Sequence, residues 1–432
     1  MQIERENVPQ IHFQPKREAG APVSSVSAPW TRCLRPPTAN WNPGVSRHTT
    51  MRDVSCGLLL LVAVTGLHAQ RAVRLVGTSF KLLHVSDAHI HPTDDSCRDV
   101  AANMRGFPCN STNTTKFVRS VAHLEQPDLV AYTGDTIDSD ASQAPKQAMD
   151  ALYGVAVDAG VPWAASLGNH EDEVTTMTRD EIYDYIVKMP GADMSLHGPV
   201  KDSPGNFYVD LLAPAAPDVV VARLVFFDSR DDGVELSISE AQLAWFTNIT
   251  ATLPSSPTLA FYHIPLPDYQ IAVDAGIPIS GHLNEVISAN KPNPLAFETL
   301  REGRVVAGFC GHDHTNDFCA LWRGVQLCYE GSPGFQAYAD CDPLKGCWRR
   351  RSRVTQLELS PDGRSLARVR SWKRVDGGGA LAGPAVDEEI LWSANSSVDS
   401  TNGGVGMRRV NVDRGRTLPR KKQLTLSAAP LA

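Results

Sequence analysis

The most informative stretch of the 432-residue sequence is Lys81-Leu-Leu-His-Val-Ser-Asp-Ala-His89. A short apolar run, of the length and composition of a buried strand, passes there directly into Asp87 and His89. Because residues two apart in an extended chain point the same way, these two side chains can face one metal ion together. The stretch therefore predicts a β-strand that ends in a metal site.

Four later apolar runs end in the same way. The side chains that follow them are Asp135 after residues 129–133, Asn169 and His170 after 163–167, His263 after 259–262, and His312 and His314 after 305–310. In α/β sheets, ligands bind in the crevice beyond the carboxyl ends of the strands. Glycines that precede three of these motifs allow the backbone to turn sharply. We therefore expect one site, assembled from one edge of a sheet.

The residue types in these motifs indicate which metals bind. Carboxylate and imidazole ligands suit Fe, Zn or Mn, and the set contains no thiolate. A single carboxylate such as Asp135 has two oxygens and can bridge two ions. Two-metal sites with ions roughly 4 Å apart clamp the attacking and leaving oxygens of phosphoryl transfer. We therefore predict two divalent or transition-metal ions as cofactors and a small phosphorylated substrate.

The remaining sequence indicates the fold class. Strand-like and helix-like segments alternate and are followed by a strand-rich final third, which predicts a layered α/β fold. From residue 374 to 432, Gly, Ser and charged residues replace the apolar runs, and we expect a low-complexity C-terminal tail. The predicted strands are 81–85, 128–133, 161–167, 222–227, 259–262, 304–309, 325–329, 354–359 and 366–372, and the predicted helices are 115–125 and 179–188.

Bulk composition narrows the function. The chain is 42% hydrophobic, which suits one large globular domain with tails. Its formal net charge of −7 gives no overall attraction to nucleic acid, and we expect no nucleic-acid binding. The oligomeric state has no sequence signal.

The five motifs, taken in order, resemble those of calcineurin-like metallophosphoesterases, the group that includes purple acid phosphatases. The sequence is most similar to the small purple-acid-phosphatase-like branch of plants and fungi, through Phe261-Tyr-His-Ile-Pro-Leu-Pro267 and Gly311-His-Asp-His-Thr-Asn-Asp-Phe-Cys319. The resemblance covers about residues 79–373, the expected catalytic domain. It implies a pair of packed β-sheets flanked by helices.

The resemblance also implies a role for each site residue. One metal would be held by Asp87, His89, Asp135 and His314, and the other by Asp135, Asn169, His263 and His312. His170 would be catalytic, either touching the phosphate or protonating the leaving group. Purple acid phosphatases carry an iron-binding Tyr three residues after the second-motif Asp, where this chain has Asp138. We therefore expect no iron–phenolate centre, and we interpret Asp138 as solvated loop charge.

The N-terminal region indicates the compartment. Residues 51–70 resemble a secretory signal peptide, with an apolar run from 56 to 67 that is short for a membrane span. An uncleaved signal anchor is the alternative, and only then would the chain be membrane-bound. Residues 1–50 are expected to be disordered, or to be an extension that precedes the natural start at Met51. Sequons lie at Asn110, Asn113, Asn248 and Asn395. We predict a glycoprotein that is secreted or resides in the secretory pathway or vacuole.

The cysteines lie in local pairs that suit an oxidising compartment. Cys310 is left over inside an apolar run, and we expect it to be a buried free thiol. Disulfides are expected, although spacing alone does not determine their connectivity. The local pairs are Cys97 with Cys109, Cys319 with Cys328, and Cys341 with Cys347.

Together these observations predict a secreted phosphatase with a binuclear metal centre, which hydrolyses phosphomonoesters by attack of a metal-activated hydroxide. Two alternatives stay open. One is a phosphodiesterase of the same fold, and the other is a catalytically silent binding protein that keeps the fold. The presence of all seven expected ligands argues against the silent relative.

Overall fold

The computed structural model describes residues 70–94, 96–100, 109–138, 143–230, 237–289, 293–342 and 346–394. The predicted N-terminal extension and all of the predicted signal segment except Gln70 lie outside these residues, and so does the sequon at Asn395. Within the described ranges, no helix is both long enough and apolar enough to cross a membrane.

One of the two main sheets has six strands, in the order β16-β15-β14-β2-β3-β4. Its first half is an antiparallel meander and its second half is parallel, with β14 joining the two. The strands are β2 (Ser79–Val85), β3 (Leu129–Thr133), β4 (Trp163–Ser166), β14 (Arg351–Leu359), β15 (Leu366–Gly378) and β16 (Leu381–Ser393).

The other main sheet has eight strands, in the order β1-β5-β6-β7-β9-β11-β10-β8. Its centre, from β6 to β11, is parallel, and antiparallel pairs flank the centre. The strands are β1 (Gln70–Arg74), β5 (Phe207–Ala213), β6 (Ala216–Phe226), β7 (Thr258–Phe261), β8 (Ile279–Ser280), β9 (Val305–Cys310), β10 (Cys319–Trp322) and β11 (Val325–Tyr329). A two-stranded ribbon, β12 (Cys341–Asp342) with β13 (Gly346–Cys347), lies outside both sheets.

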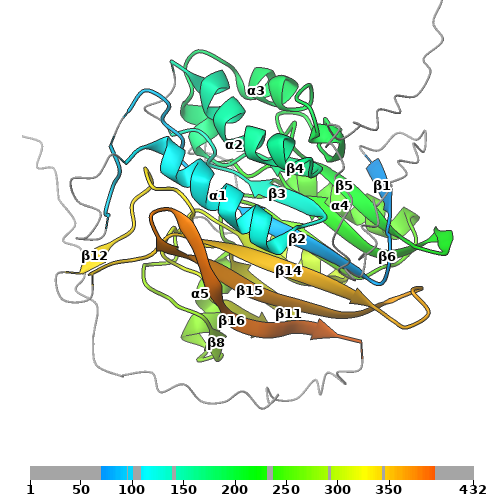
Figure 1. The fold of residues 1–432 in the computed structure, drawn as a ribbon. Coiled ribbons are helices and arrows are strands. Elements are labelled where there is room, and N and C mark those ends of the chain that lie inside the picture. Colours follow the sequence, from blue (N-terminus) through cyan, green and yellow to red (C-terminus); the bar gives the residue numbers. More distant parts are fainter. Residues whose placement is uncertain are drawn as a thin grey trace, which may run out of the picture. The chain divides into compact units, whose positions relative to one another are not determined.

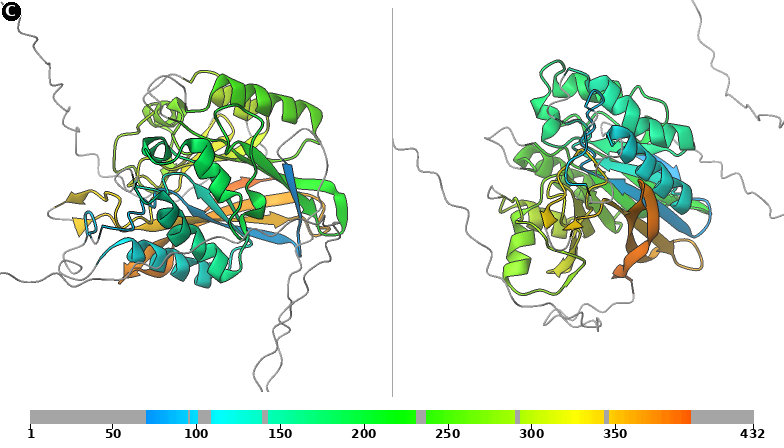
Figure 2. Two further views of the ribbon diagram at one scale, coloured as in Figure 1. Left: turned by 90° about the horizontal axis from the view of Figure 1, so that it is seen from above. Right: turned by 60° about the vertical axis from the view of Figure 1, so that its left-hand side comes forward.

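Helices cover the outer faces of the two sheets (Figures 1 and 2). α1, α2 and α3 belong to the core of the six-stranded sheet, and α4, α5 and α6 pack on the eight-stranded sheet. Local signals start them: Asn110 and Asn113 form a capping box for α1, and Pro145 opens α2. Their bounds are α1 (Ser111–Glu125), α2 (Pro145–Ala159), α3 (Arg179–Ile186), α4 (Glu240–Thr252), α5 (Pro267–Asp274) and α6 (Ala296–Glu302), with 3₁₀ turns η3 (His170–Glu173) and η4 (Ala192–Met194).

The two sheets pack face to face through an aromatic row on the eight-stranded sheet. Phe207, Phe226, Phe261 and Phe309 stack across β5, β6, β7 and β9, with neighbouring ring centroids 4.7–5.4 Å apart. His84 of β2 meets this row from the other sheet, 4.7 Å from the Phe309 centroid. Such ring pairs stabilise the interface beyond the area that they bury.

His84 also has a polar partner inside the interface. Its Nδ1 lies 2.9 Å from Oε1 of Glu330, and both side chains are almost fully buried. The second oxygen of Glu330 accepts a hydrogen bond from Thr133 at the end of β3. His84 is therefore part of the packed interior, and its partner lies 246 residues away in the chain.

The predicted fold class is confirmed: the chain forms two packed sheets with helices outside them. All nine predicted strands are present; most differ little at their ends, whereas β6 begins earlier, at Ala216, and β15 ends later. The sheet does not end at residue 373, where we placed the start of the low-complexity tail. β15 continues to Gly378, and β16 adds an edge strand as far as Ser393. Residues 395–432 lie outside the described part of the chain.

A buried charge cluster fastens these C-terminal strands to the loop before β10. Lys373 of β15 is fully buried, with Nζ 3.3 Å from Oδ1 of Asp317 and 3.0 Å from Oδ2 of Asp387. Arg351 also contacts Asp317. Burial alone would raise the pKa of Asp317, but His282 and Arg351 hold it well below its ordinary value. Because Lys373 and Arg351 already neutralise the carboxylates, we assign no metal to this cluster.

The cysteine predictions are confirmed. Disulfides join Cys97 to Cys109, Cys319 to Cys328 and Cys341 to Cys347. Cys310 is a buried free thiol whose pKa is raised by burial.

Candidate metal centre

Strand ends from both sheets deliver the predicted ligands to one place. β2 leads to Asp87 and His89, β3 to Asp135, β4 to Asn169 and His170, β7 to His263, and β9 to His312 and His314. Among the described residues, the potential ligand atoms form overlapping groups in which all atoms lie within 4.8 Å of one another. These groups are Asp87–His89–His314, His89–Asp135–His170 and Asp135–His263–His312. The expectation of one sheet edge was wrong, because the site joins the carboxyl edges of two packed sheets.

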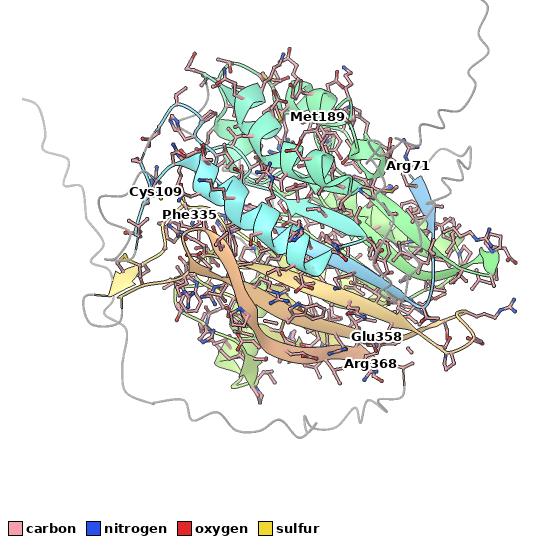
Figure 3. All side chains as sticks on the ribbon, viewed as in Figure 1. Arg71, Cys109, Met189, Phe335, Glu358 and Arg368 are labelled. Carbon is pink, nitrogen blue, oxygen red and sulfur yellow. A yellow bond between two sulfur atoms is a disulfide. The ribbon has the colours of Figure 1, made fainter. Side chains whose placement is uncertain are left out.

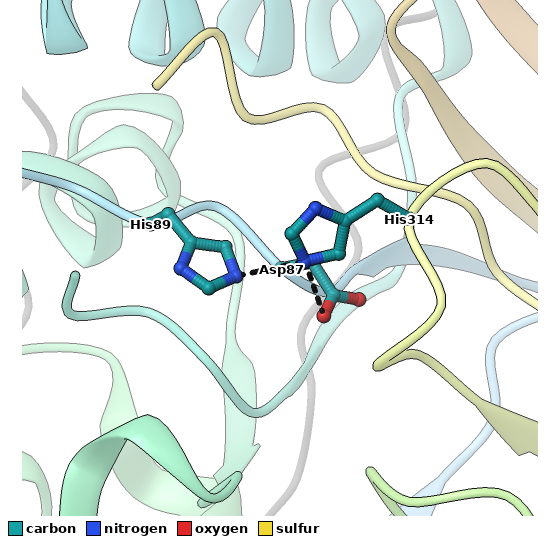
Figure 4. Close-up of side chains that lie close together, drawn as sticks. All are labelled: Asp87, His89 and His314. Carbon is teal, nitrogen blue, oxygen red and sulfur yellow. Dashed lines mark hydrogen bonds and ion pairs between the residues drawn. The ribbon is translucent and has the colours of Figure 1, made fainter. Parts of the chain in front are cut away.

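The first group is drawn in Figure 4. Nε2 of His89 lies 3.0 Å from Nε2 of His314, which lies 3.5 Å from Oδ1 of Asp87. All three side chains are buried. Burial lowers the pKa of His89 to about 3 and lowers that of His314 well below its usual range. Both rings are therefore neutral, which is the form that offers a lone pair to a metal.

Asp135 belongs to both the second and the third of these groups. Its Oδ2 is 2.9 Å from Nε2 of His263 and 3.7 Å from Nε2 of His89. Burial would raise the pKa of Asp135, but His263 and His170 hold it well below the ordinary value. The directions are opposite for His263: burial would lower its pKa, but Asp135 and Asp87 raise it to about 10. The ionised carboxylate thus occupies the position expected of a bridging ligand.

The donor set fits two metal ions. Oδ1 of Asn169 is buried and has no hydrogen-bond partner among the residues described. A buried polar atom without a partner is costly, and a cation would satisfy it. Nδ1 of His263 lies 2.9 Å from the carbonyl oxygen of Thr133, which leaves Nε2 for the metal side. Imidazole, carboxylate and amide oxygen together suit first-row transition metals.

Several of the predicted ligands have a strained backbone conformation. Left-handed φ angles occur at Asp87 (56°), His89 (44°), Asp135 (48°) and His312 (73°). Each such residue costs about 1–3 kcal/mol of folding free energy, and the conformation persists only where its surroundings hold it in place. The site provides that support: the His312 amide donates to Oδ1 of Asp87 at 2.9 Å, and the His170 amide donates to Oδ1 of Asp135 at 2.9 Å.

Two motif glycines are required for close approach rather than for turning. A Cβ on Gly168 would lie 2.3 Å from Oδ1 of Asp135. A Cβ on Gly311 would lie 1.9 Å from Oγ of Ser86 and 2.2 Å from Oδ2 of Asp87. Any side chain at either position would displace a predicted ligand.

Glu171 holds the turn after β3 and was not singled out from the sequence. Its buried carboxylate accepts hydrogen bonds from four backbone amides: those of Asp135 (3.1 Å), Thr136 (2.8 Å), Ile137 (3.2 Å) and Gly168 (2.7 Å). Burial and the nearby charge of Asp135 raise the pKa of Glu171. Glu171 thus joins the second motif to the third without being a ligand itself.

Asp138 corrects a second expectation. It is 2% exposed rather than solvated, and its Oδ2 lies 3.8 Å from Nδ1 of His89 and 3.7 Å from the guanidinium of Arg98. An isolated β-bridge between Ile90 and Ile137 draws the two segments together. The position that holds an iron-binding Tyr in purple acid phosphatases thus carries a carboxylate that faces the outer nitrogen of a predicted ligand.

His170 is more accessible than the buried ligands Asp87, His89, Asp135, His263 and His314. Its side chain is 27% exposed, with Nε2 3.8 Å from Oδ2 of Asp135 and Nδ1 3.2 Å from Oε2 of Glu173. Burial would lower its pKa, but Asp135 and Glu173 raise it above the ordinary value. The position is compatible with contact to a substrate and also with metal ligation beside His89, so the catalytic role of His170 stays a prediction.

Packed α/β sheets that bring buried histidines and carboxylates together in this way define a candidate two-metal hydrolase. The sequence matches the profile of the calcineurin-like phosphoesterase family over residues 80–316, and the chain belongs to that family. The family resemblance stated from the motifs is thereby confirmed.

Similar proteins occur in plants. Probable inactive purple acid phosphatase 29 of Arabidopsis thaliana is 31% identical over 375 residues, which cover 79% of this chain and 93% of that protein. Probable inactive purple acid phosphatase 28 of the same plant is 32% identical over 354 residues, covering 74% and 85%. A dimetal phosphatase structure from Danio rerio is 14% identical and covers 74% of this chain and all of that one, with a TM-score of 0.45.

Proposed function

We propose that this chain is a secreted, metal-dependent phosphatase that hydrolyses phosphomonoesters. The observation that carries the proposal is the meeting of all the predicted ligand motifs at one place, with neutral imidazoles at His89 and His314 and an ionised Asp135. A protein that had only kept the fold would have no physical reason to retain strained, buried polar residues there.

Each residue then has a defined task. One ion would be held by Asp87, His89, Asp135 and His314, and the other by Asp135, Asn169, His263 and His312. When bound, the ions would activate the attacking water and neutralise charge on the phosphoryl oxygens. Asp138 lies 3.8 Å from the outer nitrogen of His89, and the carbonyl of Thr133 orients His263. His170, on the open side, donates a proton to the leaving-group oxygen.

The names of the two Arabidopsis relatives favour a second candidate, a silent binding protein. A phosphodiesterase of the same fold is the third. Elemental analysis combined with turnover of p-nitrophenyl phosphate and bis(p-nitrophenyl) phosphate separates the three. We expect close to two metal ions per chain and faster hydrolysis of the monoester. Two bound metals with no turnover of either ester would support the silent protein, and faster diester hydrolysis would support the phosphodiesterase.

Asp135→Asn provides the control for that experiment. Because Asp135 faces both metal groups, its loss should weaken both sites at once, and the variant should lose metal and activity together. Retention of two tightly held ions in Asp135→Asn would refute its bridging role.

The secreted location has separate support. Three disulfides are compatible with an oxidising compartment. N-terminal sequencing of protein from the culture medium tests the location. A start near Arg71 requires cleavage of the signal segment, whereas a membrane-retained chain that begins upstream would indicate an anchor.

A further inference from the structure

An aromatic side chain borders the metal centre and has no role so far. The ring of Tyr338 stacks on the ring of His314, with centroids 3.9 Å apart and an angle of 21° between the planes. Tyr338 is nevertheless 37% exposed. One face of the ring therefore covers a predicted ligand while part of the side chain meets solvent beside the site.

The hydroxyl group of Tyr338 already has a hydrogen-bond partner. It donates to Oε2 of Glu285 at 2.7 Å, and Oε1 of Glu285 accepts from the amide of Thr315 at 2.6 Å. The amide of Glu285 in turn lies 3.1 Å from Oδ1 of Asn316. These bonds fasten Tyr338 and the loop around Glu285 to the segment that directly follows His314. The hydroxyl is thus part of the scaffold, and the ring is the part that remains available.

A buried arginine holds the backbone behind the ring. Arg350 donates to the carbonyl oxygens of Tyr338 (3.0 Å), Ala337 (2.8 Å) and Arg98 (2.7 Å). The segment just before Tyr338 is also fixed to the start of α1, because the amide of Phe335 (labelled in Figure 3) donates to Oγ1 of Thr114 at 2.9 Å. The Tyr338 ring is therefore held in one place before any ligand arrives, which reduces the entropy cost of a contact with it.

We propose that Tyr338 is a substrate-contacting specificity residue, and that it selects phosphomonoesters whose leaving group is aromatic or similarly planar. This inference rests on the proposed function. In an aryl phosphate, one oxygen separates the aromatic ring from phosphorus. A phosphoryl group bound at the metals would therefore bring this leaving group within reach of the Tyr338 ring, which covers His314. Preorganised aromatic surface favours planar apolar groups over small polar ones.

Binding of non-hydrolysable phosphonates tests the inference without requiring turnover. The probes are phenylphosphonate and methylphosphonate, measured by calorimetry on metal-loaded protein whose metal content is determined for every variant. We expect the wild type to bind phenylphosphonate about three- to tenfold more tightly than methylphosphonate. Tyr338→Phe should keep this ratio, because the lost hydroxyl faces Glu285. Tyr338→Leu and Tyr338→Met, which still cover His314, should lower the ratio at least threefold.

A matched control is Tyr185→Leu. Tyr185 of α3 also bonds a carboxylate through its hydroxyl, that of Asp150 at 2.8 Å, and it is fastened to α2 instead of to the metal motifs. Its ratio should equal that of the wild type. Equal ratios in the wild type, Tyr338→Leu and Tyr338→Met would overturn the inference while leaving the proposed function intact. Failure of both phosphonates to bind metal-loaded wild type would overturn the proposed function and this inference with it.

Discussion

The substitution Glu171→Gln removes the charge of this side chain and keeps its shape. It should weaken the hydrogen bonds that support the backbone behind the metal centre. In Glu171→Gln, one oxygen is kept and can still accept two amides, but an NH₂ group faces the other two donors. Two hydrogen bonds to a buried carboxylate are lost, at about 1.5–3 kcal/mol each. We therefore expect a loss of about 3–6 kcal/mol in the free energy of unfolding, which is a large part of the total stability of an ordinary domain.

Whichever oxygen is replaced, at least one freed amide belongs to the turn that carries Asp135, whose left-handed backbone depends on its surroundings. The variant should therefore bind both metals more weakly. The assay is urea unfolding of metal-loaded and chelator-treated protein, with metal content measured after gel filtration. Glu173→Gln is the control for stability, because Glu173 is half exposed and its change should cost less than about 1 kcal/mol. An unchanged unfolding midpoint in Glu171→Gln, together with two retained metals, would refute the reasoning.

Three further outcomes are expected. His170→Ala should keep both metals and lose about 10²–10⁴-fold in kcat on alkyl phosphates, with a smaller loss on aryl phosphates that need little protonation; metal loss would instead identify His170 as a ligand. Replacing the Cys97–Cys109 disulfide by two serines should lower the unfolding free energy by about 3 kcal/mol, and peptide mapping without reduction should recover the linked peptides. Asp317→Asn should destabilise the protein at neutral pH. Because the pKa of Asp317 is depressed in the folded state, its ionised form stabilises the fold above the unfolded pKa of about 3.9, and the difference from wild type should shrink as the pH falls below that value; a pH-independent difference would contradict the assignment.

The strand ends could be predicted because their signals are local. Apolar runs that lead into Gly134-Asp135 or Gly311-His312 predict both a buried strand and the polar residues at its end. That the motifs meet follows from the layout of α/β sheets. The sequence did not reveal that two sheets share the site, because strand pairing is a long-range property.

The supporting residues could not be predicted for the same reason. Glu330, Arg350 and Tyr338 are defined by partners hundreds of residues away or by packing against a ring, and nothing beside them in the sequence marks them. Asp138 was misread because polar loop residues are usually solvated, whereas here a β-bridge buries the segment. β16 was missed because it is an edge strand in which Leu391 alone is buried and the other side chains are partly or fully exposed, so it lacks the alternation of apolar and polar residues that reveals a half-buried strand.

The edge position of β16 has a practical consequence for anyone who shortens this chain. A fragment cut at residue 373 would remove β16 together with the last part of β15, and the remaining β15 would present a row of unpaired backbone amides and carbonyls to solvent. Exposed edges of this kind template intermolecular pairing and aggregation. The same cut would also remove Arg374, whose guanidinium donates a hydrogen bond to Glu125 of α1, and the buried side chain of Leu391. A soluble catalytic fragment should therefore extend beyond Ser393, and poor yield from a shorter one would reflect the lost strand rather than a defect of the metal centre.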